Sequence, residues 1–125
     1  MITEDYVSFE IAKLLKAKGF DELCNKKYNG YKIIVPAGRN IELWQNSEFD
    51  VDEECSAPTF QMAMKWLREA HHIHIATEPY AGYETHACFI WKNGMGINWQ
   101  NSFHTFKTYE EACEEAIKFS LKYLI

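Results

Sequence analysis

Three stretches of the chain repeat apolar residues three or four positions apart, which is the spacing of one face of an α-helix. The stretches are residues 4–18, 56–72 and 108–125. Gly19 suits the position just after the first helix, and Ser56 can cap the second. Thr108 and Glu111 form a capping box at the start of the third. The pattern therefore predicts three amphipathic helices.

Between these helices the chain changes to short runs rich in β-branched and aromatic residues, some of them alternating with polar residues. The runs predicted as strands are 31–35, 41–44, 73–77, 85–91 and 96–103. Asn29-Gly30 and Asn93-Gly94 are turn signals. The element order is α-β-β-α-β-β-β-α. It predicts a single α+β domain over residues 1–125, with an antiparallel sheet of about five strands and three helices packed mainly on one face.

The composition agrees with a folded domain. The chain has 125 residues, 47% of them apolar and 15% aromatic, which is enough to build a core. The longest apolar runs fall far short of the ~20 residues that a membrane helix needs. The first ten residues lack the basic-then-apolar pattern of a signal peptide. We expect a cytoplasmic protein without membrane attachment, in which the four cysteines are reduced.

The negative charge is local. The net charge is −5, and residues 46–56 alone hold five of the 18 acidic residues. The other 13 acidic residues balance the 13 basic ones. This segment lacks the central glycine of a calcium-binding EF-hand loop, so a solvated loop is predicted. The absence of a basic excess disfavours nucleic acid as a partner.

Three ordered blocks carry longer motifs: residues 7–22, 56–77 and 108–125. The second block holds a PTxQxAxxWLRE helix followed by an HHIHI strand, and the third opens with TYEEA. In these blocks the chain resembles a family of small uncharacterised proteins encoded by phages and prophages of Bacteroides and related gut bacteria. The matching residues are Pro58, Thr59, Gln61, Ala63, Trp66, Leu67, Arg68, Glu69, His71, Ile73 and Ile75, then Thr108 to Ala112. The resemblance implies an origin, but no substrate, cofactor or catalytic residue.

Three of the five histidines fall where the second predicted helix meets a strand, at His71, His72 and His74. His71 ends the helix, where an imidazole can meet the last carbonyls. His72 and His74 alternate with two isoleucines and so share one face of the strand. We expect Ile73 and Ile75 to point to the core, which leaves both histidines on the solvated face.

The next strand offers two more metal-ligating side chains. Its residues expected to face the core are Ala87, Phe89 and Trp91. A turn centred on Ala81 would then pair His74 with Cys88, and four candidate ligands would share the solvated face: His72, His74, His86 and Cys88. Such ligands suit zinc or copper. No recognised ligand spacing is present, so the sequence favours solvated histidines without a metal or cofactor.

Cys55 is a second candidate, for a reactive thiol. It precedes the predicted start of the second helix, a position that lowers the pKa of a thiol. Asp52, Glu53 and Glu54 come immediately before it and raise that pKa again. No histidine is tied to Cys55 by a motif, so a cysteine enzyme is disfavoured.

The predicted strands also carry Phe89, Trp91, Trp99 and Phe103. Aromatic side chains on an open sheet can stack on single-stranded bases. The helices need the same face for a core, and aromatic residues are usually buried, so a core role is favoured. A strict two-residue Asn-Gly turn would not bring Trp91 to the side of Trp99, whereas a three-residue loop or a bulge would.

The sequence thus favours a non-enzymatic phage or prophage accessory protein that binds a host or phage partner protein in the bacterial cytosol. Two alternatives stay open: a nucleic-acid-binding module that uses the sheet aromatics, and a metal- or thiol-dependent enzyme on the His/Cys face. No catalytic residue is assigned. An uncovered sheet face would also allow the chain to form a homodimer.

Overall fold

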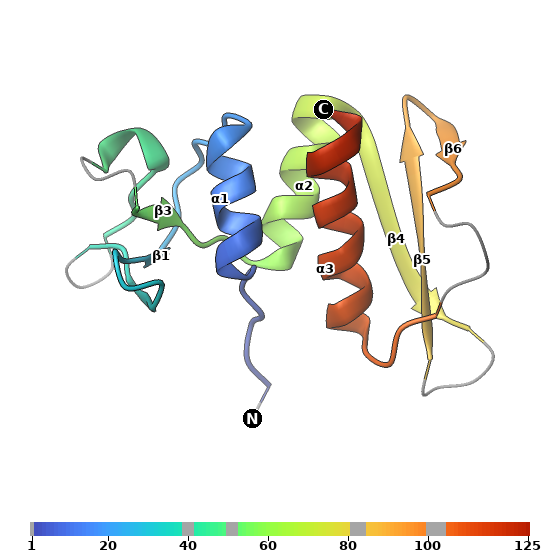
Figure 1. The fold of residues 1–125 in the computed structure, drawn as a ribbon, viewed down its shortest axis with the longest axis horizontal. Coiled ribbons are helices and arrows are strands. Elements are labelled where there is room, and N and C mark those ends of the chain that lie inside the picture. The colour runs from blue at the N-terminus through green and yellow to red at the C-terminus, as the bar shows by residue number, and fades with distance from the viewer. Residues whose placement is uncertain (1, 39–41, 50–52, 81–84, 100–104) are drawn as a thin grey trace. The chain divides into compact units, whose positions relative to one another are not determined.

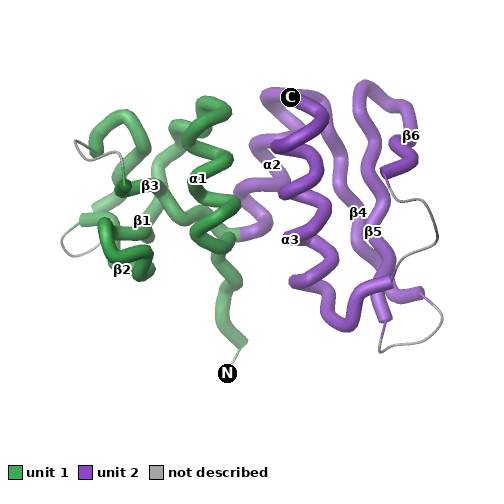
Figure 2. Tube along the Cα trace, viewed as in Figure 1, with its two compact units in different colours: residues 1–59 green, residues 60–125 purple. Residues whose placement is uncertain are grey.

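The computed structural model describes residues 2–38, 42–49, 53–80, 85–99 and 105–125. Within them lie three α-helices and six strands, in two antiparallel three-stranded sheets. The α+β class with antiparallel pairing is confirmed, although the sequence predicted about five strands in one sheet. The chain divides into two compact units, residues 1–59 and 60–125, which Figure 2 distinguishes by colour. The single domain over residues 1–125 stays a prediction.

The first unit combines one helix with a small sheet. Helix α1 spans Phe9–Ala17, and the strands are β1 (Lys26–Tyr28), β2 (Ile34–Pro36) and β3 (Cys55–Ser56). The sheet order is β2-β1-β3, with both pairings antiparallel. Strand β1 is therefore central, and it joins a hairpin partner to a strand that arrives from much later in the sequence.

The C-terminal end of α1 matches its sequence signal, whereas the helix begins at Phe9 rather than at residue 4 as predicted. The Ser8 side chain caps the helix by accepting a hydrogen bond from the Ile11 amide, at 3.3 Å. Gly19 follows the helix with φ of 93°, a left-handed conformation that glycine adopts without a steric penalty. The Phe20 amide then donates back to the Leu15 carbonyl at 2.9 Å, and the Phe20 side chain is buried. The predicted glycine cap with its apolar contact is confirmed.

Asn46 connects three segments in the interior of this unit. It begins a short 3₁₀ turn, Asn46–Glu48, and its side chain is buried. Its Nδ2 donates to the Phe20 carbonyl at 2.7 Å, and its Oδ1 accepts from the Ser56 amide at 2.8 Å. One amide side chain thus satisfies a carbonyl just after α1 and the amide of the last residue of β3.

The second unit packs two helices on a sheet. Its elements are α2 (Phe60–His71), β4 (Ile73–Pro79), β5 (His86–Lys92), β6 (Met95–Ile97) and α3 (Tyr109–Phe119), which continues in a π-helical turn, Ser120–Leu124. The sheet order is β4-β5-β6, and Figure 1 shows α2 and α3 on the same side of it. This arrangement agrees with helices packed mainly on one face. No helix among the described residues is long and apolar enough to cross a membrane.

The register of β4 and β5 decides which side chains meet the helices. Thr77 pairs with Cys88, and Ile75 pairs with Ile90. These residues face the helices, whereas the opposite face, here called the outer face, carries the even-numbered residues of β4 and the odd-numbered residues of β5. The outer-face residues are His74, Ala76, Glu78, Ala87, Phe89 and Trp91. The predicted pairing of His74 with Cys88 is wrong, because His74 pairs with Trp91.

The turn between β5 and β6 fixes the next register. Lys92 pairs with Met95, so Asn93-Gly94 is a two-residue turn. Both residues have positive φ, 53° and 80°, as a type I′ turn requires. Trp91 consequently pairs with Gly96, on the outer face, and Ile90 pairs with Ile97 on the helix face. The strict turn therefore separates Trp91 from the core face that the sequence favoured for it.

Several predicted boundaries are wrong. Strands β1 and β3 were not predicted, and the second helix begins at Phe60 rather than at residue 56. Of the predicted strand 41–44, Ile41 lies outside the described residues, and Trp44 makes only an isolated bridge to Cys24. Strand β6 ends at Ile97, and residues 100–104 also lie outside the described part. The missed strands have three and two residues, too few for an alternating pattern to be visible.

His72 ends α2 in a left-handed conformation, with φ of 56°. Its amide donates to the Arg68 carbonyl at 3.2 Å, and its carbonyl accepts from the Asn93 amide at 2.9 Å. Because this conformation is unfavourable for residues with a Cβ, His72→Gly is expected to raise the free energy of unfolding by about 0.5–1 kcal/mol. The β-branched variant His72→Val is expected to lower it by about 1–2 kcal/mol. Urea unfolding measures both, and an equal effect of the two variants would contradict the backbone explanation.

Candidate functional site

The four predicted metal candidates do not share a face. His72 lies at the junction after α2, and His74 is exposed on the outer face. His86 and Cys88 lie on the helix face, against α3. Among the described residues there is no group of three or more His, Cys, Asp or Glu that could hold a metal ion. The cause is the β4–β5 register, which places His74 on the side of the sheet away from Cys88.

A cluster of polar side chains fills the helix face at one end of the sheet. The Thr77 hydroxyl lies 3.0 Å from Cys88 Sγ and 3.3 Å from Cys113 Sγ, and we call these three residues the thiol cluster. Cys113 comes from α3, whose first turn is held by the Thr108 side chain accepting from the Glu111 amide at 3.0 Å. The capping box predicted from the sequence thus begins the helix that brings Cys113 to the sheet.

Two more side chains border the thiol cluster. The Tyr109 hydroxyl accepts a hydrogen bond from Gln61 Nε2 at 3.3 Å. The His86 ring meets the Tyr109 ring edge-on, at 6.3 Å between centroids. His86 Nδ1 is buried and has no hydrogen-bond partner among the described residues. The imidazole is therefore not engaged as a base with either thiol.

The electrostatics of the thiol cluster oppose nucleophilic chemistry. Burial raises the pKa of Cys88 to about 11, an effect that the hydrogen bond with Thr77 only partly offsets. Burial also raises the pKa of Cys113, against opposing hydrogen bonds from Thr77 and Tyr109. A thiol enzyme needs a lowered pKa or an adjacent base. At neutral pH both thiols are protonated, so the cluster contributes polar contacts within a packed core.

Cys55 lies in strand β3 rather than at a helix N-terminus, because α2 begins only at Phe60. Its side chain is buried, and burial is the largest effect on its pKa, raising it to about 11. Lys16 and Lys13 act in the opposite direction. The sequence expected neighbouring acids to raise this pKa, whereas the structure assigns the increase to loss of solvent.

The thiols are expected to resist alkylation in the folded protein. A pKa increase from 9.0 to about 11 for Cys24, Cys55 and Cys88 lowers the thiolate fraction at neutral pH by about 100-fold. Burial restricts access to the reagent further. Iodoacetamide labelling at pH 7.5, followed by mass spectrometry, should show less than one adduct per chain before unfolding and four in denaturant. An added surface thiol, Ser47→Cys, should react at the ordinary rate, and rapid labelling of any native cysteine would contradict the expectation.

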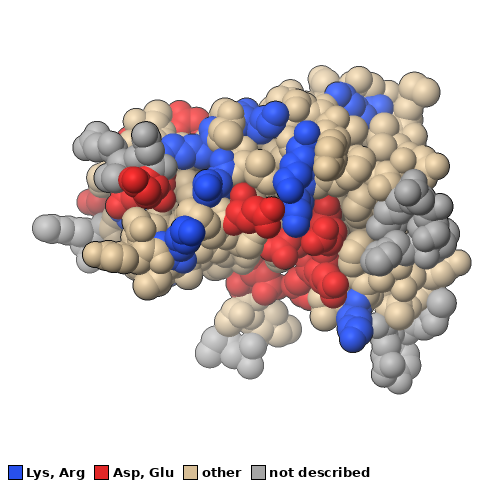
Figure 3. All heavy atoms as spheres, in the orientation of Figure 1, with Lys and Arg blue, Asp and Glu red and all other residues tan. Residues whose placement is uncertain are grey.

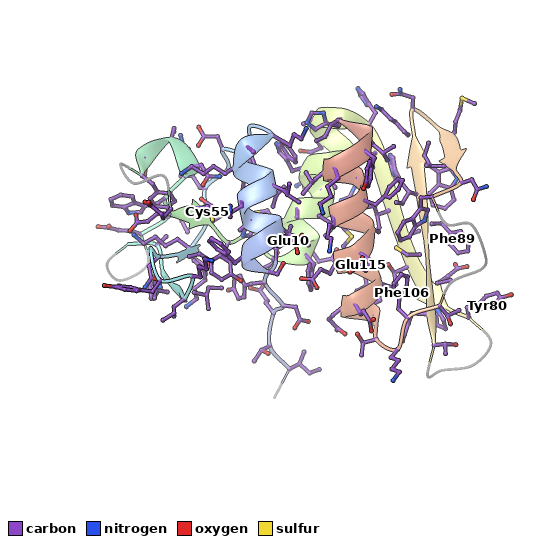
Figure 4. The ribbon with its side chains drawn as sticks, in the orientation of Figure 1. Glu10, Cys55, Tyr80, Phe89, Phe106 and Glu115 are labelled. Carbon is purple, nitrogen blue, oxygen red and sulfur yellow. The ribbon has the colours of Figure 1, made fainter. Side chains whose placement is uncertain are left out.

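The sheet aromatics are divided between two environments. Phe89 and Trp91 lie together on the outer face, with 6.2 Å between ring centroids, and Trp91 is 36% exposed. Trp99 instead stacks on Phe106, at 6.3 Å, and donates from Nε1 to the Cys88 carbonyl at 3.2 Å. In Figure 4 Phe89 and Phe106 lie on opposite sides of β5. The prediction that Phe89 and Trp91 face the helices is wrong, and Phe103 lies outside the described residues.

The environment of Phe89 and Trp91 does not favour nucleic acid. Glu78 is exposed on the same face, whereas stacking sites for single strands are lined with cations that neutralise phosphate. The carboxylate of Glu78 beside these aromatics therefore suits a protein surface better than a polyanion. The acidic residues that begin α3 lie on the opposite face of the sheet, and Figure 3 shows acidic side chains gathered near the start of that helix.

A shallow pocket of ≈ 270 Å³ lies beside the C-terminal part of α3. Its lining residues are Trp99, Glu115, Lys118, Phe119, Lys122 and Tyr123. The Trp99 and Phe119 rings form an aromatic pair, with 5.4 Å between centroids. The pocket combines aromatic surface with charged side chains of both signs, a lining that suits contact with a side chain of another protein.

The β1–β2 hairpin of the first unit carries three exposed apolar residues close together in the chain. Tyr31, Ile33 and Ile34 are 85%, 57% and 39% exposed, and we call these three residues the hairpin surface. The loop that presents them is ordered by Asn29, whose Oδ1 accepts from the amides of Tyr31 at 2.9 Å and Ile33 at 3.2 Å. The sequence identified Asn29-Gly30 as a turn but expected 31–35 to be a strand, so this surface was not predicted.

Comparison with known proteins gives no relative for the chain. No family model, no curated protein and no solved structure matches it. The resemblance to phage and prophage proteins of Bacteroides-type bacteria therefore stays a prediction, and function has to be inferred from the surfaces described above.

Proposed function

We propose that this chain is a non-enzymatic accessory protein that acts by binding a partner protein, and that the hairpin surface is its contact. The observation that carries the proposal is the exposure of Tyr31, Ile33 and Ile34, at 85%, 57% and 39%, on one short loop and strand. Contiguous exposed apolar side chains are typical of interaction sites. Tyrosine is also among the residues that contribute most to binding at protein interfaces.

The hairpin is suited to this role because its backbone is already ordered. Asn29 holds the loop with two side-chain hydrogen bonds, and β2 pairs with β1 through Lys26 to Tyr28. Lys32 lies between Tyr31 and Ile33, and its ammonium is 5.5 Å from the centre of the Phe9 ring. An ordered loop loses less conformational entropy on binding than a disordered one. The partner expected for such a loop offers an apolar pocket.

The phage or prophage origin and the cytosolic site of action rest on the sequence resemblance alone. Within the described residues the chemistry agrees with a binding role, since Cys55, Cys88 and Cys113 are buried with raised pKa values. Burial of these thiols is consistent with a role in packing the core, which leaves the exposed surface for binding.

Capture from a lysate of Bacteroides-type host cells tests this proposal. The wild-type chain and the variant Tyr31→Ser/Ile33→Ser are compared as tagged baits, with Tyr123→Ser as the control because Tyr123 is also highly exposed. A specific partner should be retained by the wild type and the control and reduced at least ~10-fold by the hairpin variant. Retention of the same proteins by all three baits would contradict the assignment of the hairpin surface.

A further inference from the structure

Strand β4 lies at one edge of its sheet and has seven residues, which makes it as long as the central strand. The hydrogen bonds at the two ends of β4 show which of its backbone groups point toward β5. The Asn93 amide donates to the His72 carbonyl, and the Tyr80 amide donates to the Thr85 carbonyl. Since the bonding pattern of an antiparallel pair alternates, the even-numbered residues of β4 bond to β5.

The odd-numbered residues therefore direct their amides and carbonyls away from β5. These are Ile73, Ile75 and Thr77, and within the described part of the chain their backbone groups have no partner at that edge. Pro79, the last residue of the strand, presents a carbonyl there but no amide. An unpaired edge of this length is a template for another strand.

The side chains of β4 are arranged for one particular partner. The strand sequence is Ile-His-Ile-Ala-Thr-Glu-Pro, with Ala76 at its centre. His74 and Glu78 lie two residues on either side of Ala76, and all three are exposed on the outer face. If a second copy of β4 runs antiparallel with Ala76 opposite Ala76, each His74 lies opposite the Glu78 of the other copy.

This alignment also satisfies the backbone. Ile75 and Thr77 of the two copies become a hydrogen-bonded pair, so the groups that point to the free edge are the ones that meet. Ala76, His74 and Glu78 then occupy the non-hydrogen-bonded positions, where Cα atoms approach to ~4.5 Å and side chains interact most closely. An imidazole N–H of His74 can donate a hydrogen bond to the Glu78 carboxylate at such positions, and the small Ala76 permits close approach at the two-fold axis.

Neighbouring registers lose this match. A shift of two residues in one direction places Glu78 opposite His72, which lies outside the strand in a left-handed conformation. The same shift in the other direction places Glu78 opposite Ala76 and His74 opposite Tyr80, beyond the end of β4. The alignment centred on Ala76 pairs all seven residues and forms about six backbone hydrogen bonds, because each Pro79 contributes only an acceptor.

We infer that the chain forms a homodimer in which β4 pairs antiparallel with β4 of a second copy across a two-fold axis at Ala76. The product is a continuous six-stranded sheet with two His74–Glu78 contacts on its outer face. The interface uses residues of the second unit, whereas the hairpin surface belongs to the first, so the dimer and the proposed partner-binding function are tested with different variants.

Disulfide trapping tests the register. Ala76→Cys should give a covalent dimer under mild oxidation, because residues at this position are expected to be within the 4.4–6.8 Å Cα separation of a disulfide. Glu78→Cys is the matched control, since the two copies of residue 78 would be ~13 Å apart along the strands. Mixed His74→Cys and Glu78→Cys chains should crosslink to each other. Equal crosslinking of the Ala76→Cys and Glu78→Cys proteins would overturn the inference.

Charge exchange tests the contacts in solution. Sedimentation equilibrium should show a dimer for the wild type and at least ~10-fold weaker association for His74→Glu, which opposes two carboxylates, or Glu78→Lys, which removes the acceptor opposite His74. The double variant His74→Glu/Glu78→Lys should recover association to within ~3-fold of the wild type. Ala70→Glu, which adds a charge at an exposed position of α2, should leave association unchanged. A monomeric wild type, or a double variant as weak as the single ones, would overturn the inference.

Discussion

Replacing Asn46 by alanine is expected to lower the free energy of unfolding by about 3 kcal/mol. The substitution removes the donor to the Phe20 carbonyl and the acceptor for the Ser56 amide, which are 2.7 and 2.8 Å from the Asn46 side chain. Because Asn46 is buried, water does not readily replace these partners. The Phe20 carbonyl after α1 and the amide of Ser56, the last residue of β3, would each lose their partner.

The measurement is urea unfolding followed by circular dichroism, with two comparison variants. Asn25→Ala removes the same side chain at an exposed position and should change the free energy of unfolding by less than ~0.5 kcal/mol. Asn46→Asp keeps an acceptor for the Ser56 amide but replaces the donor to the Phe20 carbonyl with an oxygen. It should therefore be at least as destabilising as alanine. A stable Asn46→Asp protein would show that the hydrogen bond to Phe20 contributes little.

Local signals in the sequence predicted two helix ends correctly, the C-terminal end of α1 and the start of α3. Gly19 with Phe20, and Thr108 with Glu111, each specify a cap through groups within a few residues of one another. Such geometry depends on backbone conformation and on a side chain that reaches its own segment. A helix cap of this kind therefore forms whichever elements the helix packs against.

The short strands could not be predicted for the opposite reason. Strand β3 has two residues, and Cys55 pairs with Tyr28, 27 positions earlier in the chain. Its conformation is set by this long-range pairing, and no pattern within two residues reveals it. Asn46 was missed for a similar reason, because its importance comes from burial between two segments that are distant from it in sequence.

The candidate metal site was predicted from a β4–β5 register that differs from the one in the structure. The sequence favoured aromatic residues in the core, although a strict Asn93-Gly94 turn was known to conflict with that placement of Trp91. The structure has the strict turn, and Cys88 pairs with Thr77, three residues away from the expected partner His74. An odd shift exchanges the two faces of a strand. The Asn93-Gly94 turn therefore determined the face on which Trp91 lies, against the general tendency of aromatic residues to be buried.

The positions of His74 and Glu78 on β4 can be interpreted only once the register of the sheet is known. The His-Ile-Ala-Thr-Glu segment is visible in the sequence, yet its symmetry about Ala76 has no meaning until the free edge and the outer face are assigned. The structure supplies both, through the hydrogen bonds beside His72 and Tyr80 and the pairing of Thr77 with Cys88. In the proposed dimer, His74, which the sequence favoured as a solvated side chain, becomes the partner of a glutamate in a second copy.

Replacing Leu67 by alanine is expected to have the largest effect in the second unit, lowering the free energy of unfolding by about 3–4 kcal/mol. Leu67 is fully buried on the face of α2 that also carries Phe60, Ala63 and Met64. The substitution removes apolar contacts and leaves a cavity that neighbouring side chains fill only in part. Leu23→Ala, at an exposed leucine of the first unit, should cost less than ~1 kcal/mol.

Hydrogen exchange followed by mass spectrometry shows which elements are destabilised as well as how large the effect is. Because α2 and α3 both contact β4, loss of packing at Leu67 should speed exchange of amides in all three elements. Asn46→Ala should instead act first on amides of α1 and β3, whose ends Asn46 joins. If Leu67→Ala leaves the exchange of α3 unchanged while that of α2 rises, the helix layer of the second unit is less cooperative than its shared core implies.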